Sequence, residues 1–118
     1  MSKPIIERVA IVGSRDGVSE AMVRAYVETL PMGSTVISGG AKGVDTFAIK
    51  AARARGLYVR VFEPDYWKHD MAAPLVRNKL IAESCDRMVV FWNGKSRGSM
   101  YAARCAERLG KPVETIQC

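Results

Sequence analysis

The sequence predicts an α/β protein built on a doubly wound, parallel five-stranded sheet flanked by helices. Short apolar runs suited to strands alternate along the chain with longer segments whose apolar residues recur at helical spacing. Two of the runs, Val9 to Val12 and Met88 to Phe91, are apolar throughout. Such strands are typical of a parallel sheet that helices cover on both faces.

The first half of the chain predicts two consecutive strand-loop-helix units. Residues 8–13 form an apolar run that ends in glycine and predict the first strand, and the helical spacing over residues 19–30 predicts the first helix. Residues 35–38 predict the second strand, and the glycine loop 39–43 follows it. The second helix is expected over residues 45–55, where a following glycine is placed to cap it.

The second half of the chain continues the alternation. Further strands are expected at residues 58–62, 87–92 and 113–116, and further helices at residues 75–84 and 99–109. Between the third strand and the third helix, residues 64–74 are expected to form a loop. A loop of that length is unusual in a compact domain and is often functional.

Length and charge limit what the protein does. A chain of 118 residues is expected to form one domain, residues 1–118, because chains divide into several cores only at greater length. Eighteen Lys and Arg against twelve Asp and Glu give a formal net charge of +6. This excess favours anionic partners and leaves nucleotides, phosphate ligands and nucleic acids open. A homo-oligomer is compatible with the sequence.

The sequence favours a reducing cytoplasm and no membrane. Its longest apolar stretch, Met88 to Trp92, is far shorter than a membrane span, and Met1 to Pro4 show no apolar signal core. Cys85, Cys105 and Cys118 have no CxxC or Cys/His spacing, so we expect no disulfide framework, no metal site and no cofactor. The first two of these cysteines are expected to be small core residues.

Glycine and polar residues cluster where the predicted strands end. In a parallel sheet these carboxyl ends share one edge, and ligands bind there beside the point where the strand order reverses. The loops and helix starts at this edge supply the candidate ligand-binding residues Gly13, Ser14, Arg15, Ser38, Gly39, Gly40, Ala41, Lys42, Gly43, Asp45, Trp67, Arg77, Asn78, Gly94, Lys95, Ser96, Gly98 and Ser99.

The glycine loop 39–43 is interpreted as a phosphate cradle, because glycines let backbone amides approach an anion beside a helix N-terminus. The alternative is a tight turn with no ligand. A second glycine loop at 94–98 on the same edge favours the cradle. Known nucleotide motifs do not fit: Lys42 precedes Gly43 where a P-loop needs Gly-Lys-Ser/Thr, and no GxGxxG follows the first strand.

Five further side chains are candidates for contacts with a ligand. Arg77 suits phosphate or carboxylate and Asn78 a ribose or base, unless the pair lies on a solvated helix face. Asp45 either holds a ribose hydroxyl or caps its own helix. Trp67 either stacks on a base or pins its loop to the core. His69 lacks a partner for a triad or a metal.

Together these motifs resemble one known family. Gly13-Ser14-Arg15, the loop from Ser38 to Asp45, Trp67, Arg77-Asn78 and the stretch from Gly94 to Ser99 resemble the YspA/YpsA-related branch of the SLOG superfamily over nearly the whole chain. The resemblance implies a Rossmann-like fold and binding of a nucleotide-derived ligand. The same superfamily includes LOG-type phosphoribohydrolases and the DNA-processing protein A family.

The resemblance also bears on catalysis. LOG-type enzymes carry a catalytic Glu three residues after a Thr that Ser99 replaces here, and Ala102 stands at that place. We therefore expect a nucleotide-binding sensor, carrier or sequestering protein more than an enzyme.

Two alternatives to a small-ligand binding protein stay open. One is a nucleoside-phosphate hydrolase that uses Asp45 or Asp70, and the other is a nucleic-acid-binding module like DNA-processing protein A. Because Arg104 and Arg108 fall on predicted helix surfaces, we expect a focused anion pocket and only weak, non-specific binding of nucleic acid.

Overall fold

The computed structural model describes residues 6–118, so Met1 to Pro4 lie outside the described residues. Five strands form one parallel sheet in the order β3-β2-β1-β4-β5. Their bounds are β1 (Arg8–Gly13), β2 (Thr35–Ser38), β3 (Tyr58–Val61), β4 (Arg87–Trp92) and β5 (Val113–Gln117). The doubly wound α/β class and the position of every strand agree with the sequence prediction.

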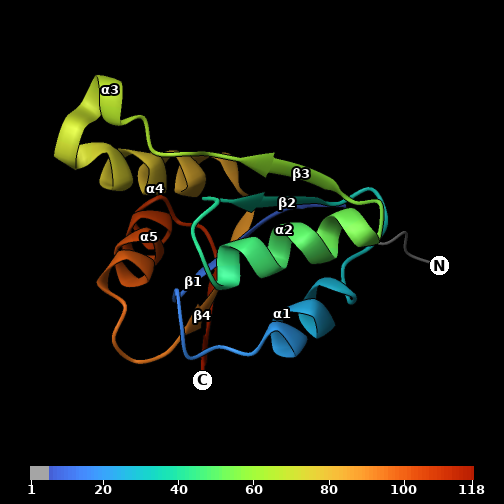
Figure 1. The fold of residues 1–118 in the computed structure, drawn as a ribbon. Coiled ribbons are helices and arrows are strands. Elements are labelled where there is room, and N and C mark those ends of the chain that lie inside the picture. The colour runs from blue at the N-terminus through green and yellow to red at the C-terminus, as the bar shows by residue number, and fades with distance from the viewer. Residues whose placement is uncertain (1–5) are drawn as a thin grey trace.

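The strand order reverses between β1 and β4, which come from different halves of the chain. Their register pairs Val9 with Arg87 at one end and Gly13 with Phe91 at the carboxyl edge. Chain segments leave β1 and β4 toward opposite faces of the sheet, since α1 follows β1 and α5 follows β4 (Figure 1). This is the topological switch point at which open parallel sheets bind ligands.

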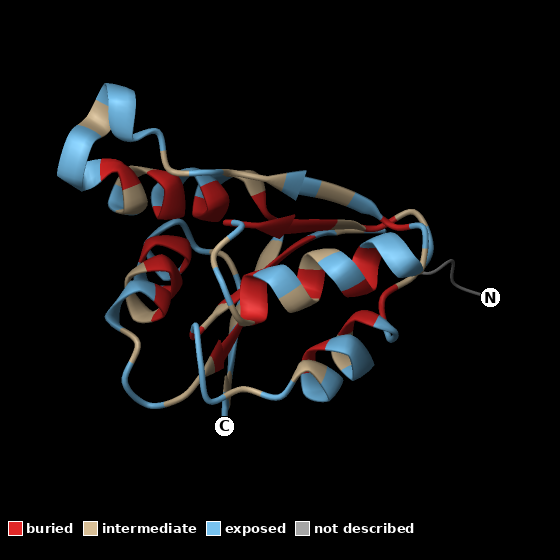
Figure 2. Cartoon of the chain, in the orientation of Figure 1, coloured by how far each residue is buried: buried red, intermediate tan, exposed pale blue. Residues whose placement is uncertain are grey.

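Helices cover both faces of the sheet. The helices α1 (Glu20–Val27) and α2 (Val44–Ala54) pack on one face, and α4 (Ala73–Ser84) and α5 (Arg97–Arg108) pack on the other (Figure 1). Successive residues of β1 alternate between the two cores, so Ile11 contacts the α1 and α2 side while Val12 contacts the α4 and α5 side. Burial on both faces explains why residues 9–12 of β1 and 88–91 of β4 are all apolar (Figure 2).

The segment expected as a loop at residues 64–74 is helical, and that prediction was wrong. It contains the short helix α3 (Tyr66–His69) and the 3₁₀ turn η1 (Asp70–Ala72), and α4 begins at Ala73. The Asp65 carboxylate accepts a hydrogen bond from the backbone N–H of Lys68 at 3.1 Å, which caps α3. No residue of α3 or η1 is buried, and the segment projects from the body of the molecule (Figures 1 and 2).

The glycine loop expected at 94–98 is also shorter than predicted. Ser96 caps α5 by accepting a hydrogen bond from the Ser99 amide, so Gly98 and Ser99 belong to the first turn of the helix. Only the turn from Asn93 to Ser96 connects β4 to α5.

Two expectations about burial and membranes can be compared with the described residues. Cys85 and Cys105 are buried in the core as expected, while Cys118 is exposed. Within residues 6–118, no helix has the length and apolar character that crossing a bilayer requires.

Candidate functional site

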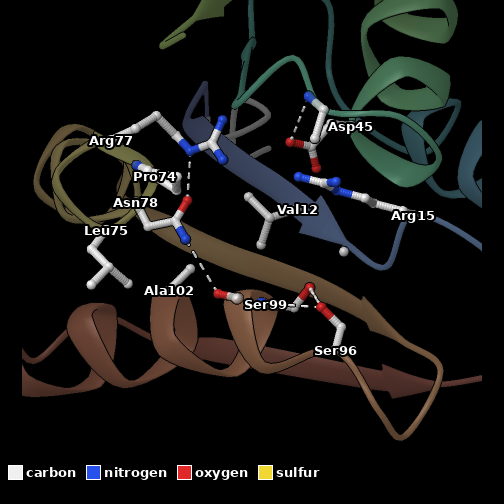
Figure 3. Close-up of a pocket in the computed structure, with 13 residues that line it drawn as sticks. Val12, Arg15, Asp45, Pro74, Leu75, Arg77, Asn78, Ser96, Ser99 and Ala102 are labelled. Carbon is white, nitrogen blue, oxygen red and sulfur yellow. Dashed lines mark hydrogen bonds between the residues drawn. The ribbon is translucent and has the colours of Figure 1, made fainter. Parts of the chain in front are cut away.

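A pocket of about 140 Å³ lies at the switch point, at the carboxyl end of β1 and between the first turns of α2, α4 and α5 (Figure 3). Arginine side chains from the loop after β1 and from α4, and serine hydroxyls at the start of α5, line this pocket. It is called the central pocket below and is lined by Val12, Gly13, Arg15, Ala41, Asp45, Pro74, Leu75, Arg77, Asn78, Ser96, Gly98, Ser99 and Ala102.

Arg77 and Asn78 tie three elements together at the floor of the central pocket. Arg77 donates from Nη1 to the Gly39 carbonyl at 2.6 Å and from Nε to the Asn78 side-chain oxygen at 2.7 Å. Asn78 in turn donates to the Gly98 carbonyl at 3.3 Å (Figure 3). Both side chains are buried, so the alternative of a solvated helix face is wrong.

Burial changes the titration of Arg77 without discharging it. Removal from water lowers the pKa of Arg77, and the negative charge of Asp45 opposes that shift. A guanidinium stays protonated in proteins, so the central pocket holds a fixed and oriented cation. Two of its nitrogens are already bonded to the protein, which restricts its rotamer and orients its remaining N–H groups for an anion.

Asp45 does not cap its own helix. Its Oδ2 atom accepts hydrogen bonds from the backbone amides of Gly39 at 3.2 Å and Ala41 at 3.3 Å, in the loop before α2. Gly43 stands at the N-cap position of α2 and makes no side-chain cap. Two amides of the expected phosphate cradle are therefore occupied by a carboxylate of the same chain.

The Asp45 carboxyl is buried at 5% relative exposure. Burial raises the pKa of Asp45 to about 6, and the amide hydrogen bonds and the Arg77 charge limit the rise. At neutral pH the group is mostly ionised, and a moderate fall in pH protonates it. The central pocket therefore carries two cations, Arg15 and Arg77, with one titratable anion on the same side as Arg15 (Figure 3).

Two glycines of this region are needed so that parts of the protein can pack against one another. A Cβ atom on Gly39 would lie 2.5 Å from Arg77 Nη1 and 2.9 Å from Asp45 Oδ2. A Cβ atom on Gly43, whose φ is 79°, would lie 2.5 Å from the carbonyl oxygens of Ser14 and Arg15. The glycines at positions 39 and 43 are thus explained by the close approach of other parts of the same chain.

Ser14 and Ser38 were predicted to bind ligand, but neither lines the central pocket. Both are fully buried. The Ser14 hydroxyl accepts a hydrogen bond from the Asn93 amide at 2.9 Å, and the Ser38 hydroxyl donates to the Asp45 carbonyl at 3.3 Å. Ser14 thus joins the loops after β1 and β4, and Ser38 joins the end of β2 to the first turn of α2.

The remaining candidates divide into two groups. Gly39 and Gly40 line a neighbouring pocket with Arg15, Tyr66 and Arg77, and Lys95 lines another. The candidates that lie outside all three of these pockets are Ser14, Ser38, Lys42, Gly43, Trp67 and Gly94. Trp67 is 100% exposed, so it does not pin its segment to the core.

Sequence reasoning did not assign Val12, Pro74, Leu75 or Ala102 to the lining of the pocket. Leu75 was assigned to the apolar side of a helix, but α4 begins two residues earlier and Leu75 lies in its first turn at the pocket wall. Ala102 was noticed only through the resemblance to LOG-type enzymes, and it lines the pocket with a methyl group. Among residues 6–118, no group of three or more His, Cys, Asp or Glu side chains is arranged to hold a metal ion.

The fold and this pocket define a Rossmann-like α/β protein with a polar, mainly cationic site at the switch point. Residues 7–69 match the model of the YspA, cpYpsA-related SLOG family. The match spans more than half of the 118 residues, and the chain belongs to that family. The resemblance noted from the motifs is confirmed.

Solved structures of another SLOG member share the fold. DNA processing protein A from Streptococcus pneumoniae aligns with a TM-score of 0.77 and 24% identity, over 96% of this chain and 51% of that one. DNA processing protein A from Helicobacter pylori, in a structure concerned with its single-stranded DNA binding mode, aligns with a TM-score of 0.70 and 23% identity. That alignment covers 92% of this chain and 64% of the other.

The chain thus spans about half to two thirds of the length of these structural relatives, and at this identity the likeness concerns the fold. No curated protein matches the chain significantly.

Proposed function

We propose that the protein binds a nucleotide or nucleotide-derived phosphate ligand in the central pocket, as a sensor, carrier or sequestering protein. The observation that carries this proposal is the convergence of the Arg15 and Arg77 guanidinium groups on the switch point, beside the Asn78 amide and the hydroxyls of Ser96 and Ser99. Arginine forks suit phosphate oxygens, and amides and hydroxyls suit a sugar or base.

Each group has a proposed part in binding. Arg77 faces the phosphate with a rotamer fixed by Gly39 and Asn78, while the exposed Arg15 closes on it from the opposite loop. The ionised Asp45 accepts a hydrogen bond from a ribose hydroxyl. The Ser96 and Ser99 hydroxyls, whose oxygens lie 2.9 Å apart, supply donors on the α5 side.

The size of the pocket limits how much of the proposed nucleotide it can hold. About 140 Å³ is below the ~300–1,000 Å³ of typical ligand sites, so only a phosphate and part of a sugar fit within it. A neighbouring pocket of about 200 Å³ shares Arg15, Ala41 and Arg77 with the central pocket, and Tyr66 lines it. The base of a mononucleotide is proposed to lie there, against Tyr66.

Binding is favoured over catalysis because of the carboxylates available. Ala102 offers no acid or nucleophile, and Asp70, named above as a candidate, does not line the central pocket. Asp45 is the remaining carboxylate, and two amide hydrogen bonds restrain it. Release of adenine from AMP should therefore be absent or far below an ordinary enzymatic rate of ~1 per second, and faster turnover that Asp45→Asn abolishes would establish the hydrolase instead.

Binding of single-stranded nucleic acid is the second candidate function. The fold likeness to the Helicobacter pylori DNA processing protein A, together with the net charge of +6, favours it. Non-specific binding is expected to have a Kd on the order of 10⁻⁴ to 10⁻⁶ M and to weaken steeply with salt. Nanomolar binding of a labelled oligonucleotide at physiological salt would favour nucleic acid as the main ligand.

Calorimetric titration with AMP tests the main proposal. Arg15→Gln should weaken AMP binding about tenfold, because it removes an exposed phosphate contact without opening the core. Arg53→Gln is the matched control, since Arg53 is an exposed arginine on α2 that does not line the central pocket. Equal affinity in the two variants would overturn the assignment of the phosphate to this pocket.

A further inference from the structure

A second and larger pocket, of about 550 Å³, lies on the α5 side of the central pocket. Trp92 at the end of β4, Lys95 in the following turn, and Arg97, Tyr101 and Arg104 on α5 all line it. It is called the α5 pocket below. Its volume falls within the range of ordinary small-molecule sites.

The charge of the α5 pocket differs from that of the central pocket. Three cations line it, namely Lys95, Arg97 and Arg104, and its lining includes no Asp or Glu. Within residues 6–118, none of the three has an ion-pair partner. The central pocket combines two cations with Asp45, so the larger net positive charge lies in the α5 pocket. A hollow lined by one sign of charge concentrates counter-ions of the other sign.

The sequence indicated this pocket only in part. Lys95 belongs to the loop after β4, but Arg104 was assigned to a solvated helix surface. It lies seven residues after Arg97, close to two turns of an α-helix, and the two side chains therefore lie on the same face of α5. Arg104 is exposed on α5 as expected, and it also lines this pocket.

The turn that carries Lys95 is held in place by the protein. The Trp92 indole donates from Nε1 to the Ser96 carbonyl at 2.9 Å. The Asn93 side-chain oxygen accepts from the amides of Lys95 at 2.9 Å and Ser96 at 3.1 Å. These bonds fix the backbone on which the cation stands, so little ordering remains to be done when an anion binds.

The two pockets adjoin each other. Leu75, Ser96 and Gly98 line both of them. A Cβ atom built on Gly98 would meet no atom within 4 Å, so the space beside this residue is open. A ligand held at Arg15 and Arg77 can therefore extend past Gly98 into the α5 pocket.

We propose that the α5 pocket binds a chain of linked phosphates, so that the preferred ligand of the site is a nucleoside di- or triphosphate. The α-phosphate lies in the central pocket and the distal phosphates contact Lys95, Arg97 and Arg104. This inference rests on the proposed function for the nucleoside end of the ligand. For the phosphate chain it rests on the cation cluster alone. The step is binding only, and no bond is broken.

The first test uses inorganic tripolyphosphate as the probe and Trp92 fluorescence as the readout. The chain has two tryptophans, and Trp67→Phe removes the exposed one, which leaves the reporter that lines the α5 pocket. Tripolyphosphate should change this fluorescence saturably. The pair Arg97→Gln with Arg104→Gln should weaken its binding at least about tenfold, whereas the control Arg53→Gln, which loses one exposed charge outside both pockets, should change it less than about twofold. Equal weakening by both, or none by either, would overturn the proposal.

The second test separates this inference from the proposed function. Wild-type protein should bind ATP about tenfold tighter than AMP, and the Arg97 and Arg104 double variant should lose that preference while its AMP affinity is kept. If AMP binds but ATP binds no tighter, the phosphate-chain site is wrong and the proposed function stands. If AMP fails to bind while tripolyphosphate still depends on Arg97 and Arg104, the proposed function is wrong and the phosphate-chain site stands.

Discussion

The loop from Gly39 to Gly43 and the turn from Asn93 to Ser96 both lie at the carboxyl edge of the sheet, and both looked like anion sites in the sequence. The two segments differ in what their polar groups contact. In the first loop, the amides of Gly39 and Ala41 are bonded to Asp45, and the Gly39 carbonyl is bonded to Arg77. The second segment turns its lysine toward an open pocket.

This difference shows that glycine alone does not identify a phosphate cradle. Close approach of backbone segments requires glycine just as a ligand does. The deciding observation is whether the amides are already satisfied inside the protein, since a bonded amide offers little to an anion. By this criterion neither segment is an amide cradle, since the amides of Lys95 and Ser96 are bonded to the Asn93 side chain. The first loop is a structural support that positions Arg77, and the second presents the Lys95 side chain to a pocket.

The largest expected effect is a difference in stability between substitutions of two glycines, Gly43 in the first loop and Gly98 just after the second segment. Gly43→Ala should lower the free energy of unfolding by about 3 to 5 kcal/mol, because the new Cβ meets two backbone carbonyls at 2.5 Å and φ is 79°. Gly98→Ala, in the first turn of α5 with open space around it, should leave stability within about 1 kcal/mol or raise it. Urea denaturation of both variants measures the contrast, and equal losses would contradict it.

Arg77→Met is expected to have the next largest effect. It removes the bonds to Gly39 and Asn78 and leaves the buried Asp45 carboxylate without the buried cation near it, which should cost about 3 kcal/mol. Adding Asp45→Asn to the same protein should recover at least about 1 kcal/mol, since no unpaired charge then remains buried. If the loss of unfolding free energy in the double variant equals the sum of the losses in the two single variants, the two residues act independently.

Asp45→Asn alone should alter the pH dependence of both stability and anion binding. Because the folded protein raises the pKa of Asp45 from 3.8 to about 6, it holds the proton more tightly than the unfolded chain. The free energy of unfolding should therefore fall as pH rises from about 4 through 6 in the wild type, and this contribution should be absent in the variant.

Sulfate is a suitable anion probe, because its charge is constant in this range of pH. Wild-type affinity for sulfate should rise about tenfold as pH falls below 6 and the carboxylate beside Arg15 and Arg77 is protonated. The Asp45→Asn variant should bind sulfate with equal affinity above and below pH 6. Nuclear magnetic resonance titration measures the change, and a pH response that persists in the variant would assign it to another group.

The smallest effect compares one lysine from each segment. Lys95→Gln should weaken tripolyphosphate binding about threefold, because this exposed cation lines the α5 pocket. Lys42→Gln removes the same charge from the first loop, where the side chain lies outside both the central and the α5 pockets, and should change affinity less than about twofold. If the two variants lose the same amount of tripolyphosphate affinity, binding depends on the net charge of the protein and not on the position of the lysine.

Much of the fold follows from local pattern. The near-continuous apolar runs of β1 and β4 predicted a sheet covered on both faces. The glycine after the second predicted helix marked its end correctly, since α2 ends at Ala54 and Gly56 follows its C-cap. The helix α3 was missed because it is four residues long, and its start depends on one cap by Asp65 that looks like an ordinary loop residue in the sequence.

The site was only partly accessible to the same reasoning. Arg15, Arg77 and Asn78 follow from the rule that places ligands at strand ends, whether or not they bind. The bond between Asp45 and the loop amides, and the joining of Arg104 to Lys95 in one pocket, depend on how α2 and α5 pack. A single sequence contains no local signal for either.

A nitrogen-15 resonance titration with AMP tests the central claim, that a nucleotide binds at the switch point between β1 and β4, most directly. The largest changes are expected at the backbone amides of Arg15, Ala41, Ser96 and Ser99, which border the central pocket from three loops. Smaller changes are expected on α1 and β5, whose residues do not line it. Saturable changes centred on α1 or β5, with the amides around Arg15 and Ser99 unmoved, would contradict the account.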